Sequence, residues 1–340
     1  MKTLTIHSAE NITIEDAPVP EPGEGEVRVR MMYGGICGSD LHYYFEGRNG
    51  AFVVTEPLVP GHEMSGVVDL DPSGRLAPGT RITIAPATYG TSEPGIEDRP
   101  YLWPNGSYFG SASTKPHTQG GMSEYRVVKD FMIRVLPDEL GLREASLAEP
   151  LAVALHAIVL AGGVEGKKVL VTGSGPIGLC LAAAAVVKGA AEVTATDVLD
   201  GPLSRARSLG VQHTINVREE QIPALAYDVV FECSGVGPAI SPALAAVRRG
   251  GTVAQVGMLP DREIGVNLAP FVSKEVTYVG CFRFNDEIGE AIELLASYPQ
   301  LAGVITHVID AENVVEAFQT ARNSQESGKV VVSLWLDEQD

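Results

Sequence analysis

Four residues in the first half of the chain have side chains that zinc takes as ligands. Cys37 lies in the segment GGICGSDLH (residues 34–42), and His62 and Glu63 follow in PGHE. A catalytic zinc binds three such groups and keeps one position open. Glu149, in the segment AEPL, is a further oxygen that can replace water at that position. A single Cys or His is more often a packed core residue, but the flanking glycines argue against simple core strands.

A glycine-rich turn, GSGPIG at residues 173–178, predicts a dinucleotide site. The turn follows an apolar run and precedes an Ala-rich stretch, which is the strand-turn-helix setting that the motif requires. Gly173 permits the tight turn, Gly175 lets the backbone approach a pyrophosphate, and Gly178 lets the helix pack on the strand. The helix that opens at Pro176 and Ile177 directs free N–H groups at the phosphates.

The choice of cofactor depends on Asp197, which follows the glycines by about 20 residues and can bind an adenosine ribose. A carboxylate there repels a 2′-phosphate, and Pro202 stands where an arginine might meet one, so NAD is expected. Arg205 and Arg207 lie nearby and leave NADP open. The alternative is that the glycines only connect two elements and Asp197 caps a helix. Val256, Gly257 and Met258, after a later strand, are expected at the same edge.

Two kinds of sequence pattern surround these residues. Up to residue 85, short apolar strands are split by Gly, Pro and Asp, which predicts an antiparallel, barrel-like unit. From residue 146, strands and Ala-rich helices alternate, which predicts a parallel sheet with helices on both faces. We therefore expect an α/β protein in which a Rossmann-type, doubly wound domain (147–285) is inserted into a β-rich catalytic domain (1–146 and 286–340). Residues 85–121 are rich in Pro and Gly and lack a period, which indicates a functional loop.

Composition narrows the partners and the location. The chain has 340 residues and a net charge of −18, which disfavours nucleic acid and anionic membrane surfaces as partners. Its four cysteines lack paired spacing, so no disulfide framework is expected. No signal peptide pattern and no apolar run long enough for a membrane helix are visible. We expect a cytoplasmic protein.

The motifs at residues 35–44, 61–63, 148–153 and 173–178, in this order and spacing, resemble the zinc-containing medium-chain dehydrogenase/reductase family, and within it the sorbitol dehydrogenase branch. The resemblance spans essentially the whole chain and implies a GroES-like catalytic domain. It implies that Cys37 and His62 hold a catalytic zinc, that Glu63 binds it directly or through water, and that Glu149 is an exchanging ligand or substrate contact.

The same resemblance implies further roles. Ser39 receives the alcohol proton and passes it towards His42, which is otherwise a structural hydrogen-bonding residue. Substrate contacts fall to Tyr43 and Arg283, and the latter is otherwise a surface arginine. Cys281 and Phe282 join the cofactor site. A homodimer or homotetramer is expected.

The resemblance implies a sugar acid, L-idonate first, or a polyol as substrate, with sorbitol, xylitol, galactitol or threonine as alternatives. A dinucleotide-binding regulator without catalysis is the other class, and the complete Cys37, Ser39, His62 and Glu63 set argues against it. The chain departs from the family pattern in one respect. Many members carry a four-cysteine structural zinc lobe where this chain has residues 85–121 without a cysteine, so we expect one zinc per subunit.

Overall fold

Alternating apolar residues form the strands of the first part of the molecule. On the strand Glu26–Gly35, the side chains of Val27, Val29 and Met31 are buried in the core. The computed structural model describes residues 1–336, and within them a seven-stranded sheet has the order β11-β7-β6-β3-β19-β18, with β10 also paired to β3. Its strands are β3 (Glu26–Gly35), β6 (Glu63–Leu70), β7 (Arg81–Ile84), β10 (Tyr125–Lys129), β11 (Ile133–Val135), β18 (Ile305–Asp310) and β19 (Lys329–Ser333).

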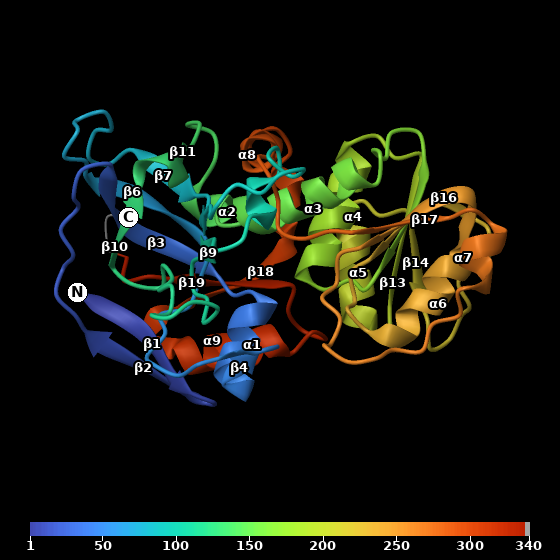
Figure 1. The fold of residues 1–340 in the computed structure, drawn as a ribbon, viewed down its shortest axis with the longest axis horizontal. Coiled ribbons are helices and arrows are strands. Elements are labelled where there is room, and N and C mark those ends of the chain that lie inside the picture. The colour runs from blue at the N-terminus through green and yellow to red at the C-terminus, as the bar shows by residue number, and fades with distance from the viewer. Residues whose placement is uncertain (337–340) are drawn as a thin grey trace.

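The C-terminal segment returns to this first sheet. β19 pairs antiparallel with β3, and β18 runs parallel to β19 (Figure 1). Short elements surround the sheet: β1 (Lys2–Ser8), β2 (Asn11–Asp16), α1 (Gly38–Glu46), β4 (Arg48–Asn49), β5 (Phe52–Val53), η2 (Asp130–Met132), α2 (Leu142–Ala145), η4 (Ala311–Asn313) and α9 (Val314–Arg322).

A parallel sheet forms the second part, to the right in Figure 1. Its strand order is β14-β13-β12-β15-β16-β17. Along β12, Val169 and Val171 face one core and Leu170 faces the other, as expected for a sheet covered by helices on both faces. The elements are α3 (Ala148–Leu160), β12 (Lys168–Thr172), α4 (Pro176–Val187), β13 (Glu192–Asp197), α5 (Asp200–Ser208), β14 (His213–Asn216), β15 (Tyr227–Glu232), α6 (Gly237–Ala246), β16 (Val247–Gln255), α7 (Ala269–Ser273), β17 (Thr277–Gly280), α8 (Ile288–Ser297) and η3 (Pro299–Val304). The predicted fold class, a Rossmann-type sheet within a GroES-like, β-rich catalytic domain, is confirmed.

The core of the parallel sheet reaches past residue 285. Ile288, Leu295 and Val304 belong to it, because α8 packs on α3. This core continues across the predicted boundary at residue 285, and the predicted domain boundaries stay a prediction. Residues 337–340 of the predicted catalytic domain lie outside the described residues.

The loop at residues 85–121 folds into a small lobe beside the first sheet. β8 (Ala87–Thr88) pairs with β9 (Ser107–Tyr108), and η1 (Pro100–Leu102) lies between them in the chain. None of the helices within residues 1–336 is long and apolar enough to cross a bilayer.

Candidate active site

Strand pairing brings the three predicted metal ligands together. Cys37 precedes α1 just after β3 ends, and Glu63 opens β6 directly opposite Gly35. A Cβ at Gly35 would lie 2.1 Å from Glu63 Oε2, so glycine is needed to make room for that carboxylate. In the described chain, the ligand atoms of Cys37, His62 and Glu63 all lie within 4.8 Å of one another. These atoms offer a thiolate, an imidazole and a carboxylate to one ion.

Within residues 1–336, two buried atoms of this cluster have no hydrogen-bond partner: His62 Nδ1 and Glu63 Oε2. An unsatisfied buried polar atom is costly, so these two acceptors fit a bound cation. The charges agree. Burial lowers the pKa of His62, but Cys37, Asp40 and Glu149 raise it well above the ordinary value, so positive charge is favoured there. The residues present therefore fit zinc.

Asp40 joins the two loops that carry the cluster, and the sequence analysis gave it no role. Its carboxylate, fully buried, accepts the N–H of Cys37 at 3.0 Å and that of Gly61 at 3.1 Å. One side chain thus fixes the backbone beside Cys37 and beside His62. Burial raises the pKa of Asp40. An Asp three residues into a helix that starts at a candidate ligand was the available sequence signal.

Lys329 is a second residue that sequence reasoning missed. Its ammonium lies 2.6 Å from Glu63 Oε1 and donates to the carbonyl of Ile36 at 3.0 Å. Lys329, Glu63 and Ile36 are all buried. Burial alone lowers the pKa of Lys329, but Glu63 and Cys37 raise it above the ordinary value. Lys329 thereby holds one oxygen of Glu63 and leaves the other directed at the cluster.

Glu149 lies near the cluster but is not one of its three closely spaced members. It is buried on α3 and accepts the hydroxyl of Tyr108 at 2.5 Å. The Tyr108 ring in turn packs edge-on against His62 at 5.5 Å between centroids. Burial raises the pKa of Glu149, and burial together with Glu149 raises the pKa of Tyr108 well above its ordinary value. The role of Glu149 at the metal stays a prediction.

The residues proposed for the proton path and the substrate lie on α1 and the 281–284 loop. Ser39 is half-buried in the first turn of α1, and His42 is exposed with Nδ1 2.9 Å from Glu46 Oε1. Tyr43 is buried, and its hydroxyl accepts the N–H of Ala112 at 3.1 Å. The Arg283 guanidinium lies over the Tyr108 ring at 4.2 Å. Their functional roles remain predictions.

The glycine turn has the geometry that each of its glycines predicts. Gly173 has φ 84°, and a Cβ there would lie 2.8 Å from Ser234 Cα. A Cβ at Gly178 would lie 1.9 Å from the Gly173 carbonyl oxygen. Gly175 faces open space at the start of α4, so the backbone N–H groups that follow Pro176 are accessible to a phosphate.

Asp197 ends β13 beside this turn. Its Oδ2 accepts the N–H of Ser174 at 2.9 Å, and Oδ1 accepts the N–H groups of Val198 and Leu199. The two nearby arginines are engaged elsewhere. Arg205 donates to the carbonyl groups of Ser324 and Gln325, and Arg207 donates to Thr214 Oγ1 at 2.6 Å.

The remaining expected cofactor residues follow β16 and β17 at the same carboxyl edge. Gly257 is tightly packed, since a Cβ there would lie 2.2 Å from the Gly235 nitrogen. Met258 is 75% exposed and Phe282 41% exposed, while burial raises the pKa of Cys281 to about 11. Buried Glu232 fixes this edge by accepting the N–H groups of Ser234 and Gly235, which sequence reasoning did not foresee. Val256 donates its N–H to the carbonyl of Glu232 at 2.8 Å.

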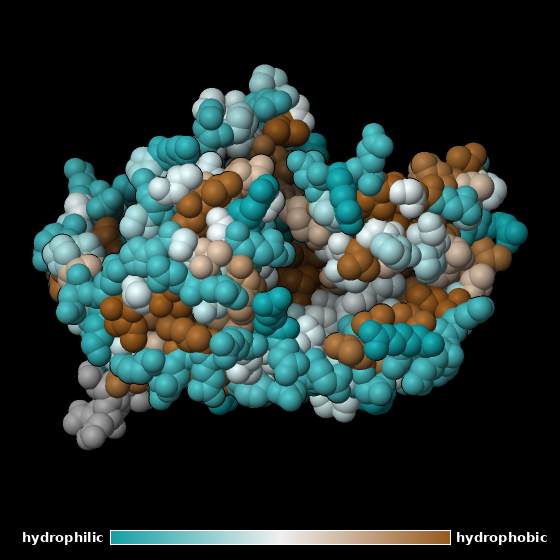
Figure 2. Space-filling model, turned by 90° about the horizontal axis from the view of Figure 1, so that it is seen from below, coloured by the Kyte–Doolittle hydropathy of each residue, from teal (hydrophilic) through white to brown (hydrophobic). Residues whose placement is uncertain are grey.

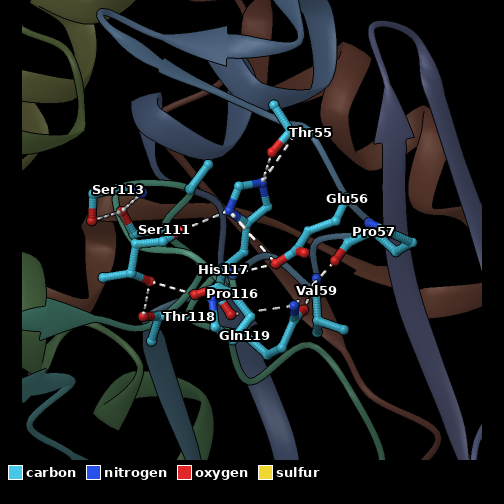
Figure 3. Close-up of polar contacts among 12 residues, drawn as sticks. Thr55, Glu56, Pro57, Val59, Ser111, Ser113, Pro116, His117, Thr118 and Gln119 are labelled. Carbon is cyan, nitrogen blue, oxygen red and sulfur yellow. Dashed lines mark hydrogen bonds and ion pairs between the residues drawn. The ribbon is translucent and has the colours of Figure 1, made fainter.

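A hydrogen-bonded network supports the loop before His62. Buried His117 accepts the N–H of Thr55 at 3.0 Å (Figure 3). Its Nδ1 contacts the carbonyl of Thr114 at 2.9 Å. Gln119 accepts the N–H of Val59 at 2.6 Å in the same network (Figure 3). Figure 2 shows the hollow between the two parts of the molecule, with apolar side chains deep inside it. Fold and site together define a metal-dependent oxidoreductase of the dinucleotide-binding class.

Comparisons with known proteins agree with this class. Residues 23–138 match the alcohol dehydrogenase GroES-like domain, and residues 176–297 match the zinc-binding dehydrogenase domain. Sorbitol dehydrogenase of Gallus gallus is 35% identical over 335 residues, covering 95% of this chain and 93% of that protein. D-xylulose reductase of Saccharomyces cerevisiae is 35% identical, covering 94% and 93%.

The solved structure of L-idonate 5-dehydrogenase from Escherichia coli superposes with a TM-score of 0.92 at 29% identity, covering 98% of this chain and 97% of that one. The chain belongs to the zinc-dependent medium-chain alcohol/polyol dehydrogenase family. Enzymes of this family are oxidoreductases that work with zinc and a nicotinamide cofactor.

Proposed function

We propose that this protein oxidises a secondary alcohol of a sugar acid or polyol with NAD, with L-idonate, converted to 5-keto-D-gluconate, as the first candidate substrate. The observation that carries the proposal is the cluster of Cys37, His62 and Glu63, in which two buried atoms find no partner among the described residues and suit a cation. When bound there, zinc supplies Lewis-acid chemistry that lowers the pKa of an alcohol. One zinc per subunit is proposed, since the 85–121 lobe has no cysteine.

The chain's own residues prepare the alcohol for oxidation. Ser39, two residues from Cys37, accepts the hydroxyl proton and His42 delivers it to solvent. The exposure of the His42 ring supports this direction of transfer, because a relay must end in water. Glu149, whose carboxylate accepts the Tyr108 hydroxyl and interacts electrostatically with His62, is the exchanging ligand or a substrate contact in this proposal.

NAD is proposed over NADP because of the charged side chains near the glycine turn, which are Asp197, Arg205 and Arg207. A carboxylate at Asp197 disfavours a 2′-phosphate. Arg205 and Arg207 donate to carbonyl and hydroxyl oxygens elsewhere, so these hydrogen bonds would compete with a contact to that phosphate. Asp197→Asn should therefore lower the preference for NAD over NADP in kcat/KM, with little change in the alcohol's KM.

A homodimer or homotetramer is also proposed. β17 lies at the edge of the parallel sheet, where its free side can pair with a second copy. Size-exclusion chromatography with light scattering tests this directly.

The test of the function is NAD reduction on a panel of L-idonate, sorbitol, xylitol, galactitol, threonine and ethanol, together with zinc analysis of the same protein. We expect turnover of L-idonate, or of a sugar alcohol, and little of ethanol. Bound zinc without turnover of any secondary alcohol would instead favour a dinucleotide-binding regulator.

A further inference from the structure

Tyr108 on β9 joins the lobe at residues 85–121 to the candidate metal site. Its side chain is buried, and its hydroxyl donates to Glu149 Oε1 at 2.5 Å. The ring of Tyr108 also packs edge-on against the ring of His62, with 5.5 Å between the centroids. One residue of the lobe therefore contacts both a member of the metal cluster and the carboxylate that was predicted as a further ligand.

The position of the Tyr108 hydroxyl is fixed by its surroundings. The Arg283 guanidinium covers the ring, 4.2 Å from its centroid, and the backbone of Tyr108 is paired within the β8–β9 hairpin. Two residues further on, Gly110 has φ 65°, and a Cβ there would lie 2.8 Å from the Gly61 nitrogen. The lobe and the loop before the metal cluster are thus packed too closely for a side chain between them, so the hydroxyl keeps its place relative to the cluster.

Glu149 lies beside the metal cluster but is directed at Tyr108. It is buried in the first turn of α3, which packs against β6, the strand that begins at Glu63. Its carboxylate interacts electrostatically with His62 and Glu63. In the part of the chain that the structure describes, the Tyr108 hydroxyl is the one hydrogen-bond donor to Glu149, and Glu149 is not among the residues whose ligand atoms cluster within 4.8 Å.

A buried carboxylate is stable only with a hydrogen-bond donor or a cation beside it, and Tyr108 supplies the donor for Glu149. The charge of Lys329 also acts on Glu149, but the Lys329 ammonium is already bonded to Glu63 Oε1 at 2.6 Å and to the Ile36 carbonyl at 3.0 Å. A metal ion at the cluster is then the remaining partner for Glu149. A catalytic zinc keeps one position open, which a carboxylate oxygen can occupy.

We propose that Tyr108 is a positioning residue whose hydroxyl holds Glu149 away from the metal, so that the open position stays available to the alcohol. The inference rests on the proposed function, because it requires zinc at Cys37, His62 and Glu63. It gives the lobe a part in the reaction, since the lobe supplies the hydrogen bond that competes with the metal for Glu149.

The test uses Tyr108→Phe in the zinc-loaded protein, because this substitution removes the hydroxyl and keeps the ring between His62 and Arg283. Glu149 should then bind the metal, and zinc should pass to an excess of chelator more slowly than in wild type. The expected slowing is roughly tenfold to a hundredfold, the strength of a hydrogen bond to a charged group. In protein loaded with Co²⁺ instead of zinc, the visible absorption spectrum should change as the carboxylate replaces water. The KM for a secondary alcohol should rise more than kcat falls, since the alcohol must displace Glu149.

Tyr101→Phe is the matched control, because Tyr101 is a buried tyrosine of the same lobe whose ring also packs edge-on against a histidine, His156, at 4.9 Å. It should leave zinc release and the Co²⁺ spectrum unchanged. A second control adds Tyr108→Phe to Glu149→Gln. The added substitution should change neither readout, because no carboxylate remains to move to the metal.

Zinc release from Tyr108→Phe that is as fast as in wild type, or faster, would overturn the inference, because a merely structural hydroxyl would loosen the site when removed. An unchanged Co²⁺ spectrum would overturn it too, as would a slowing that persists in the double variant with Glu149→Gln. In each of these cases the proposed function stands, provided that wild-type protein binds zinc and oxidises a secondary alcohol. Wild-type protein that binds no zinc overturns both.

Discussion

The Glu63 carboxylate and the Lys329 ammonium lie 2.6 Å apart, and both side chains are fully buried. Removing one partner leaves an uncompensated buried charge. Lys329→Met should therefore lower the free energy of unfolding by about 3–5 kcal/mol. Denaturant unfolding of the metal-free protein measures this loss, because a zinc ion bound by Glu63 would itself offset the charge of the carboxylate. The double variant Lys329→Met/Glu63→Gln should recover part of it, and strictly additive losses would show that the two residues are not coupled.

Asp40 should matter for metal affinity more than for folding. Asp40→Asn keeps the shape but weakens one of the two backbone contacts beside Cys37 and Gly61. Zinc affinity, measured by competition with a chelator, should fall by about 10–100-fold. Asp71→Asn is the control, since Asp71 accepts the N–H groups of Ser73 and Leu76 in an exposed loop. Equal effects of the two substitutions would count against the positioning role.

Substitutions at two glycines of the turn, Gly175 and Gly178, should distinguish an effect on NAD binding from an effect on folding. Gly175→Ala adds a Cβ in open space, so stability should hold, whereas the Kd for NAD should rise by roughly tenfold or more because the phosphates lose close backbone contacts. Gly178→Ala forces a Cβ against the Gly173 carbonyl and should cost about 2 kcal/mol or more of stability. Calorimetry with NAD, alongside thermal unfolding, distinguishes them. Unchanged NAD affinity in Gly175→Ala would speak against a dinucleotide at this turn.

Much of this arrangement follows from local sequence pattern. The strand before the 173–178 turn and the helix that opens at Pro176 were predicted, and the structure has them as β12 and α4. The closeness of Cys37, His62 and Glu63 was also predicted, and their ligand atoms indeed cluster. Helix α1 and strands β14 and β18 were not predicted, since their short sequences carry weak periodicity.

The missed site residues depend on long-range packing. Lys329 meets Glu63 only because β19 pairs with β3, a neighbour of β6, and no local pattern shows that pairing. Tyr108 reaches Glu149 through the β8–β9 hairpin, inside a loop that was expected to lack regular structure. The packing of α8 on α3 was likewise not predicted.

Acid should weaken the contact between α3 and α8. Burial raises the pKa of Glu287, but His156 Nδ1, 2.8 Å away, and backbone N–H groups outweigh it, so the folded pKa lies below the ordinary value. A carboxyl group whose pKa is lower in the folded protein stabilises the fold at pH values above its unfolded pKa of about 4.3. This stabilisation is lost as the pH falls through the folded pKa.

The destabilisation by Glu287→Gln, measured by denaturant unfolding, should therefore be larger at pH 7 than near pH 3.5. Glu290 also lies on α8, and its ion pair with Lys188 is more exposed than the pair of Glu287 with His156. Glu290→Gln should therefore have a small effect at both pH values. A Glu287→Gln effect that does not depend on pH would contradict this account.

The central claim is that Cys37, His62 and Glu63 hold one catalytic zinc, and zinc content measured together with NAD reduction in wild type and Cys37→Ser tests it most directly. The account predicts one zinc per wild-type chain, loss of both zinc and turnover in Cys37→Ser, and wild-type activity that disappears on chelation and returns with added zinc. A Cys37→Ser variant that keeps its zinc and its full turnover would contradict the account.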